Sequence, residues 1–280
     1  MQKQEQIRFL EHTPIEEYKV NWKRVFVKRE DLFDPINRNA KMRGINAYLL
    51  KHTEIKKIGV YDTRISRAGL GTANIAIRNF GIETYIFYQK NKHDEERKEH
   101  LQAQELGAKL YPCNGTRTSI CFYQGRRIMQ EEIEGTMLPL GLTLVESVNA
   151  VWQEANTIPK ELCNELGTLV MCIGSGTMFS GVIGGLKDLP KKVYGITLGM
   201  DSIHNKWIRE ATLYTTTRDI RLLENAQIVN YIQAEKSYYE KENIDCPFEC
   251  SQYYDKKAWK WLKDNILELE EPILSWNIGI

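Results

Sequence analysis

The sequence predicts an α/β fold in which mainly parallel sheets are flanked by helices. Short apolar runs with the length of strands alternate with longer patterns typical of helices. This alternation indicates parallel sheets, because two parallel strands need a crossover, usually a helix, between them. A length of 280 residues, 42% of them hydrophobic, is enough for one large core or two smaller ones.

The expected elements follow one another along the chain. Glycine marks two helix ends, since segment 66–81 ends on Gly81 and segment 94–108 stops at Gly107. A third helix, 178–189, is apolar and rich in small residues. The expected strands are 24–30, 56–61, 83–89, 108–113, 168–173, 192–197 and 272–278.

Two lobes are predicted from the count of strand–helix units, because no linker composition marks a boundary. Units 56–89 and 83–113 share a strand and make a small sheet, while the later strands make another. We therefore expect a small domain over 47–148 and a large domain from 1–46 and 149–280. The ligand is expected in the cleft between the lobes, since open α/β sheets bind ligands at the carboxyl ends of their strands.

Charge and residue usage argue against several classes of protein. A net charge of +1 gives no general field toward nucleic acid or an anionic membrane. Six scattered cysteines indicate reduced thiols, and the five histidines lack zinc-site spacing, so no metal is expected. The N-terminus lacks the apolar core of a signal peptide, and no run reaches membrane-spanning length. We therefore expect a cytoplasmic protein with no membrane partner.

A glycine-rich turn follows the expected strand 168–173. It reads Gly174-Ser175-Gly176-Thr177 and runs into a helix. Glycines allow close approach of backbone N–H groups to an anion, and the helix dipole adds to the attraction. The sequence therefore predicts a phosphate site, the alternative being a tight turn without a ligand. P-loop and dinucleotide patterns both fit poorly, which disfavours a nucleotide-dependent oxidoreductase and favours a small phosphorylated cofactor.

Lys41, in "KMRG", is the candidate for covalent catalysis. A lysine that forms an imine must keep its amine neutral, and a nearby cation such as Arg43 would lower the pKa of that amine. The alternative is an ordinary surface lysine.

The order "VKREDL", "KMRG", a Ser-led helix, "ELGAKLYP" and "GSGT" resembles the fold-type-II pyridoxal-phosphate enzymes, over about residues 24–280. "QYYDKK" resembles the stretch "PVYEGK" of the 1-aminocyclopropane-1-carboxylate deaminase and D-cysteine desulfhydrase branch. The resemblance implies the two-lobed tryptophan synthase β-like fold, pyridoxal 5'-phosphate as cofactor and a homodimer.

The resemblance also implies roles for individual residues. Lys41 matches the Schiff-base lysine, and the 174–177 turn matches the loop that holds the cofactor phosphate. Asn39 is a further expected cofactor contact, and Asp255 matches the residue at the pyridine nitrogen, a helix N-cap being its alternative. The expected substrate contacts are Ser66, Arg67, Ala68, Gly69 and Tyr254.

Departures from the family pattern leave the substrate open. The usual Ser-Gly-Asn-Thr loop reads Ser66-Arg67-Ala68-Gly69, so Ala68 replaces the asparagine that contacts the cofactor. Arg67, in the glycine position, either clamps a carboxylate or phosphate or fills space. The basic and aromatic segment 256–263 is better explained by a helix than by a nucleic-acid surface.

The resemblance implies a lyase or deaminase that acts on an amino acid through an external aldimine and a Cα carbanion. Two alternatives remain. One is a decarboxylase or lyase whose amino acid is attached to a nucleotide or DNA base, as in bacteriophages that decorate their DNA with amino acids. The other is a catalytically inactive cofactor-binding protein.

Overall fold

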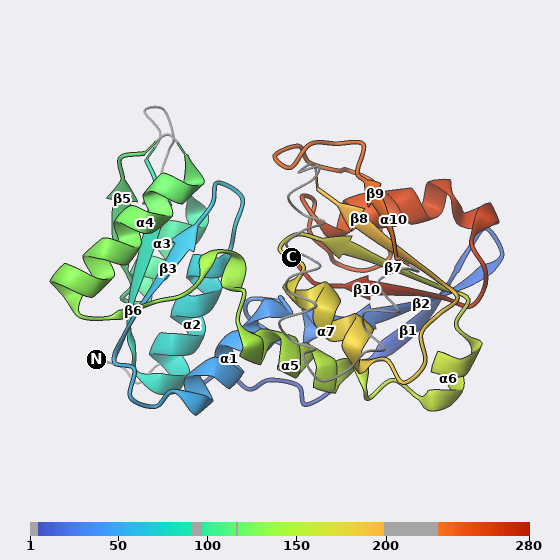
Figure 1. The fold of residues 1–280 in the computed structure, drawn as a ribbon, viewed down its shortest axis with the longest axis horizontal. Coiled ribbons are helices and arrows are strands. Elements are labelled where there is room, and N and C mark those ends of the chain that lie inside the picture. Colours follow the sequence, from blue (N-terminus) through green and yellow to red (C-terminus); the bar gives the residue numbers. More distant parts are fainter. Residues whose placement is uncertain (1–4, 91–96, 116, 199–228) are drawn as a thin grey trace. The chain divides into compact units, whose positions relative to one another are not determined.

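The fold of the chain is given by a computed structural model that describes residues 5–90, 97–115, 117–198 and 229–280. Contacts divide the chain into two compact units (Figure 1). The large unit comprises 9–44 and 145–280, and the small unit comprises 1–8 and 45–144.

The large unit is built on a six-stranded sheet of order β1-β2-β10-β7-β8-β9. The β1–β2 pair is antiparallel and every other pair is parallel. Its strands are β1 (Ile15–Val20), β2 (Lys23–Arg29), β7 (Thr168–Ile173), β8 (Lys192–Thr197), β9 (Val229–Gln233) and β10 (Ile273–Asn277). Its helices are α5 (Val145–Ala155), α6 (Lys160–Glu165), α7 (Thr177–Gly185) and α10 (Asp255–Asp264), and α1 (Lys41–Lys51) begins in this unit.

Both faces of this sheet are covered, which explains why β7 is buried along its whole length and apolar after Thr168. Leu169, Met171 and Ile173 pack in one core with residues of α5 and α7. Val170 and Cys172 point to the other face and pack in a core with residues of α10. The residues after the carboxyl end of β7 are thereby fixed between two cores.

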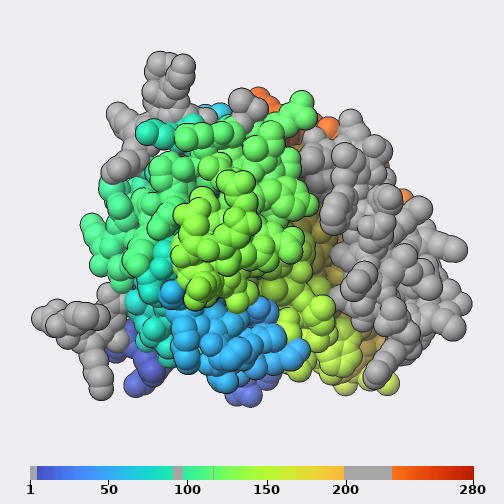
Figure 2. Space-filling model, turned by 60° about the vertical axis from the view of Figure 1, so that its left-hand side comes forward, coloured from blue at the N-terminus to red at the C-terminus, as the bar shows by residue number. Residues whose placement is uncertain are grey.

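The small unit contains a four-stranded, fully parallel sheet of order β5-β4-β3-β6. Its strands are β3 (Lys57–Asp62), β4 (Glu83–Gln89), β5 (Lys109–Cys113) and β6 (Thr136–Met137). The remaining helices are α2 (Ala68–Phe80), α3 (Lys98–Glu105) and α4 (Thr118–Ile128), and α4 contributes to the green surface of Figure 2. Helix α2 ends at Gly81, which adopts a left-handed conformation (φ 66°) that suits glycine.

All seven expected strands are present, each within two residues of its expected bounds, and the α/β class is confirmed. The short strands β1, β6 and β9 were not expected. The domain bounds 1–46 plus 149–280 and 47–148 stay a prediction.

Candidate functional site

Lys41 is the first residue of α1, directly after Asn39 and Ala40, which pair with residues 278–280 beyond β10. Asn39 Oδ1 accepts a hydrogen bond from the Lys41 backbone N–H (3.0 Å) and so caps the helix. The Asn39 side-chain amide also donates to Ile280 O (3.2 Å). Both ends of the Asn39 side chain therefore serve to position Lys41.

The Lys41 side chain provides an amine without a partner. Among the described residues, its Nζ has no hydrogen bond and no ion pair. Burial lowers the pKa of this amine, while the nearby Cys172 and Asp255 act in the opposite direction. Arg43, expected to contribute, instead directs its guanidinium to Glu30 (3.0 Å) and Glu154 (3.4 Å). Desolvation therefore lowers the pKa of the Lys41 amine. The expectation that Arg43 lowers this pKa was wrong.

Asp255 is the first residue of α10, and Tyr254 stands at the cap position without a side-chain capping bond. Asp255 Oδ1 accepts a hydrogen bond from Ile278 N (3.0 Å). Burial raises the pKa of this carboxyl to about 7, against the lowering effect of that hydrogen bond. A buried acid that is half-protonated near neutral pH can hold a proton or share one with a basic ring nitrogen.

Ile278 joins the Lys41 and Asp255 sides of the site. Its N–H donates to Asp255, and its carbonyl accepts from Ala40 N (2.8 Å), the residue before Lys41. Asn39 and Gly279 form a β-bridge beside it. The segment 278–280 therefore acts as a spacer between the Lys41 amine and the Asp255 carboxyl. No motif in its sequence predicts this role.

The glycine turn lies at the carboxyl end of β7. Gly176 has φ 85°, a left-handed value, and Thr177 begins α7. A Cβ placed on Gly174 would meet no atom within 4 Å, so open space lies beside the turn. The Ser175 and Thr177 hydroxyls are hydrogen-bonded to each other (2.9 Å), so one of the two O–H groups is left as a further donor. This is an anion cradle with room for a phosphate group.

The turn and Lys41 share one hydrophobic core. Ile173 and Met178, on either side of the turn, lie in the same buried cluster as Ala40 and Trp276. The Lys41 amine also lies close enough to Asp255, and to Cys172 near the end of β7, for their charges to affect its pKa, so the structure brings the amine, the acid and the anion cradle together within the large unit. A phosphorylated aldehyde fits these residues: a cradle for its phosphate, an unpaired amine for its carbonyl and an acid for its ring.

The expected substrate residues lie in the small unit, in the loop between β3 and α2. Ser66 Oγ accepts from Ala68 N (3.0 Å), and Gly69 N donates to Asp62 Oδ1 (2.7 Å). A Cβ on Gly69 would lie 2.5 Å from Asp62 Oδ2, so glycine is required there. Arg67 Nε is buried without a hydrogen-bond partner among the described residues. The loop thus carries a guanidinium nitrogen that is available for an anion.

Arg97, which precedes α3, braces this loop and was missed from the sequence. Its guanidinium donates to Thr63 O (2.7 Å) and Ser66 O (2.5 Å). Two loop carbonyls thereby accept hydrogen bonds from one guanidinium, which fixes the conformation of the loop. No motif marks Arg97, because its contacts are with backbone atoms 31 and 34 positions away.

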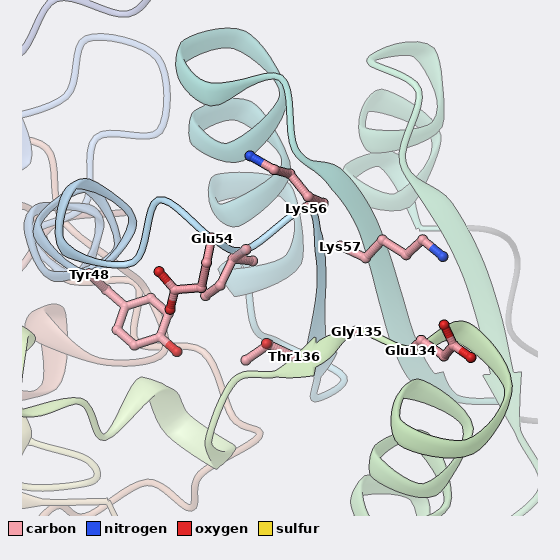
Figure 3. A pocket seen from close by; sticks show the side chains of 8 residues that line it. Tyr48, Glu54, Lys56, Lys57, Glu134, Gly135 and Thr136 are labelled. Carbon is pink, nitrogen blue, oxygen red and sulfur yellow. The ribbon is translucent and has the colours of Figure 1, made fainter.

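A separate polar pocket on the small unit contains none of the predicted site residues (Figure 3). It is lined by Tyr48, Glu54, Ile55, Lys56, Lys57, Glu134, Gly135 and Thr136. Lys57 Nζ, at its rim, already donates to Ile133 O (2.8 Å). In the parts of the chain that the structure describes, no His/Cys/Asp/Glu cluster suits a metal ion, and no helix has the length and hydropathy to cross a membrane.

Comparison with known proteins identifies the family. The model of the family "Pyridoxal-phosphate dependent enzyme" matches residues 8–238. The chain belongs to the pyridoxal-phosphate dependent enzymes. This confirms pyridoxal phosphate as the cofactor and makes the chain a fold-type-II enzyme. Tyr254 and Asp255 lie outside the matched residues.

Relatives of this pyridoxal-phosphate enzyme include a viral protein. A glycyl-dTMP PLP-dependent decarboxylase from Pseudomonas phage M6 is 30% identical over 284 residues, covering 96% of this chain and 98% of that protein. Among solved structures, an ACC deaminase homologue has a TM-score of 0.74 at 14% identity, covering 99% of this chain and 92% of that one. The processed form of threonine deaminase isoform 2 from Solanum lycopersicum has a TM-score of 0.66 at 13% identity, covering 95% and 78%. These structures confirm the tryptophan synthase β-like fold.

The pKa of Asp255 leads to a prediction about the protein without cofactor. A carboxyl whose pKa is higher in the folded state than in the unfolded state destabilises the fold as pH rises from about 4 to about 7. Asp255→Asn keeps an oxygen acceptor for Ile278 N and removes the charge. We expect the variant to be more stable than the wild type at pH 8, by on the order of 4 kcal/mol.

Denaturant unfolding of the cofactor-free proteins at pH 4 and pH 8 measures this difference. The gain should be small at pH 4, where the folded carboxyl is neutral and the unfolded one is only partly ionised. Asp264→Asn, at the other end of α10 on a half-exposed side chain, is the matched control and should show no such pH dependence. An equal gain for Asp255→Asn at both pH values would contradict a titrating buried acid.

Proposed function

We propose that this enzyme removes the carboxyl group of an amino acid that is attached to a thymidine nucleotide. The observation that carries the proposal is the likeness to the phage decarboxylase, which extends over nearly the whole length of both chains. The loop at Ser66 supports it, because Arg67 replaces the uncharged glycine usual in that position and its buried Nε has no hydrogen-bond partner in the described part of the chain. An added cation suits a substrate that carries a phosphate besides its carboxylate.

Lys41, the 174–177 turn and Asp255 are the residues that would hold the cofactor. When bound, pyridoxal phosphate condenses with a primary amine and takes up the electrons of a bond that breaks at Cα. Lys41 Nζ, whose pKa is lowered by burial, would attach to the cofactor and afterwards carry a proton to Cα. The turn would orient the phosphate. Asp255 would hold a proton at the ring nitrogen, which strengthens electron withdrawal from Cα.

In the proposed reaction the bond between Cα and the carboxylate breaks, carbon dioxide leaves, and Cα takes a proton in its place. The substrate keeps its α-amine, because only a primary amine condenses with the cofactor. The nucleotide is therefore joined to the amino acid through carbon. Ser66, Arg67, Ala68, Gly69 and Tyr254 are the residues proposed to contact the substrate, and Asn39 is proposed to contact the cofactor in addition to capping α1.

Mass spectrometry of reactions with glycyl-dTMP tests the proposal. The expected product is lighter by one carbon dioxide and keeps its amine. A free-amino-acid lyase or deaminase would instead release ammonia and a 2-oxo acid from unlinked amino acids. Cofactor uptake without turnover of any of these substrates would indicate a catalytically inactive binding protein and overturn the proposal.

We further propose a cytoplasmic homodimer. The six cysteines are all free, which agrees with a reducing compartment. Light scattering on the cofactor-loaded protein gives the mass, expected to be twice the 32.6 kDa of one chain.

A further inference from the structure

A cluster of tyrosines lies at the start of α10, in the connection from β9 (residues 234–254, orange in Figure 1). The Tyr238 and Tyr254 hydroxyls are hydrogen-bonded at 2.8 Å. The Tyr238 ring meets Tyr254 edge-on (centroids 5.8 Å apart, 79°) and Tyr239 edge-on (5.0 Å, 82°). Tyr254 directly precedes Asp255, so the cluster begins at the proposed cofactor site.

Core packing and a buried hydrogen bond hold the tyrosine cluster in place. Tyr238 and Tyr254 pack against the buried core that contains Phe248 and Trp259. The Lys257 ammonium, itself buried, donates to Ser237 O (2.6 Å) and fixes the backbone before the tyrosines. Tyr239, by contrast, is 52% exposed. One aromatic ring is thus presented to solvent on a fixed support.

The charge of this connection determines what such a ring can recognise. Between residues 235 and 249 there are five acidic residues and two lysines. Such a surface does not attract a phosphate backbone, whose binding depends on Lys and Arg. Stacking of a base on an aromatic face does not depend on positive charge, because every base has a π-face. The surface therefore suits an uncharged planar ring.

We propose that Tyr239 stacks on the nucleobase of the substrate, with the Tyr238–Tyr254 hydroxyl pair beside it to bond the polar edge of a pyrimidine. This site deepens the proposed function and rests on it for the choice of a thymine base. The base comes either from a free nucleotide or from a DNA strand.

Binding of dTMP to the cofactor-loaded enzyme, measured by calorimetry, tests the site without turnover. Tyr239→Ala should weaken dTMP binding by about 5- to 150-fold, since stacking contributes roughly 1–3 kcal/mol per base. Tyr239→Phe should bind nearly as the wild type, because it keeps the ring. The matched control is Tyr123→Ala, on α4 of the small unit. Tyr123 is 63% exposed and also meets a neighbouring ring, Phe122, edge-on.

Each outcome decides for or against the site. Equal dTMP affinity in Tyr239→Ala and the wild type, or no dTMP binding by the wild type, overturns the inference. A short single-stranded oligothymidylate distinguishes the sources: tighter binding than dTMP, still dependent on Tyr239, indicates DNA. Tyr239-dependent dTMP binding without decarboxylation of glycyl-dTMP would refute the proposed function and leave the base site standing. If Tyr239→Ala decarboxylates glycyl-dTMP as well as the wild type does, the base site is refuted and the proposed function stands.

Discussion

Lys41→Ala is expected to abolish the covalent attachment of pyridoxal phosphate and to lower kcat by at least about a thousandfold. The substitution removes both the attachment point and the group proposed to move the proton, and positioned proton transfer alone contributes roughly 10²–10⁴-fold. Peptide mass spectrometry after borohydride reduction locates the cofactor on Lys41 in the wild type and nowhere in the variant.

The fold itself should tolerate this change. The Lys41 amine is desolvated and has no partner among the described residues, so its removal relieves a cost and the thermal midpoint should stay equal or rise. Lys51→Ala, at the exposed end of the same helix, is the control and should keep both cofactor and rate. Reduced cofactor found on another lysine of the wild type would disprove the assignment of Lys41.

Glu154→Ala should be among the most destabilising single substitutions in the large unit. Glu154 Oε1 lies 2.5 Å from Lys28 Nζ, with both side chains almost fully buried, and accepts from Thr13 N (2.9 Å). Arg43 lies 3.4 Å from its other oxygen. Truncation leaves Lys28 charged and buried, which costs about 3–5 kcal/mol. The free energy of unfolding in urea measures the loss.

Two further variants distinguish the effect of losing the ion pair from the effect of losing a side chain on α5. Gln153→Ala changes the exposed neighbour on α5 and should be nearly neutral. Lys28→Met combined with Glu154→Leu removes both charges and should recover part of the stability, because a buried pair adds little over apolar residues of similar size. A double variant as unstable as Glu154→Ala would show that the ion pair is not the cause.

Local patterns were sufficient to predict the sheets. Strand β7 is buried at every position and apolar from Leu169 to Ile173 because helices cover both of its faces, and such runs are visible without a structure. Strand β1 escaped prediction because its antiparallel partner lies on one side only and its residues are half-exposed or exposed. Pattern reasoning thus succeeded where burial is complete, and three of the four edge strands (β1, β6 and β9) escaped it, while the edge strand β5 did not.

The residues that carry the chemistry of the site were predictable from motifs, but the residues that hold them in position were not. Lys41 and the 174–177 turn stand out because their chemistry needs particular residue types. Arg97 and Ile278 act through backbone atoms far along the chain, so neither their identity nor their spacing carries a signal. The source of the Lys41 pKa shift was also missed, since desolvation depends on the whole surrounding core.

The spacer 278–280 has a consequence for biosynthesis. Asn39 and Ile280, which meet beside the reactive amine, are 241 positions apart. At translation rates of roughly 5–20 residues per second, Lys41 is synthesised on the order of ten seconds or more before residues 278–280, which pair with Asn39 and Ala40. The amine is then exposed and charged, a poor nucleophile. Cofactor capture by this enzyme is accordingly an event that follows synthesis of the C-terminal strand.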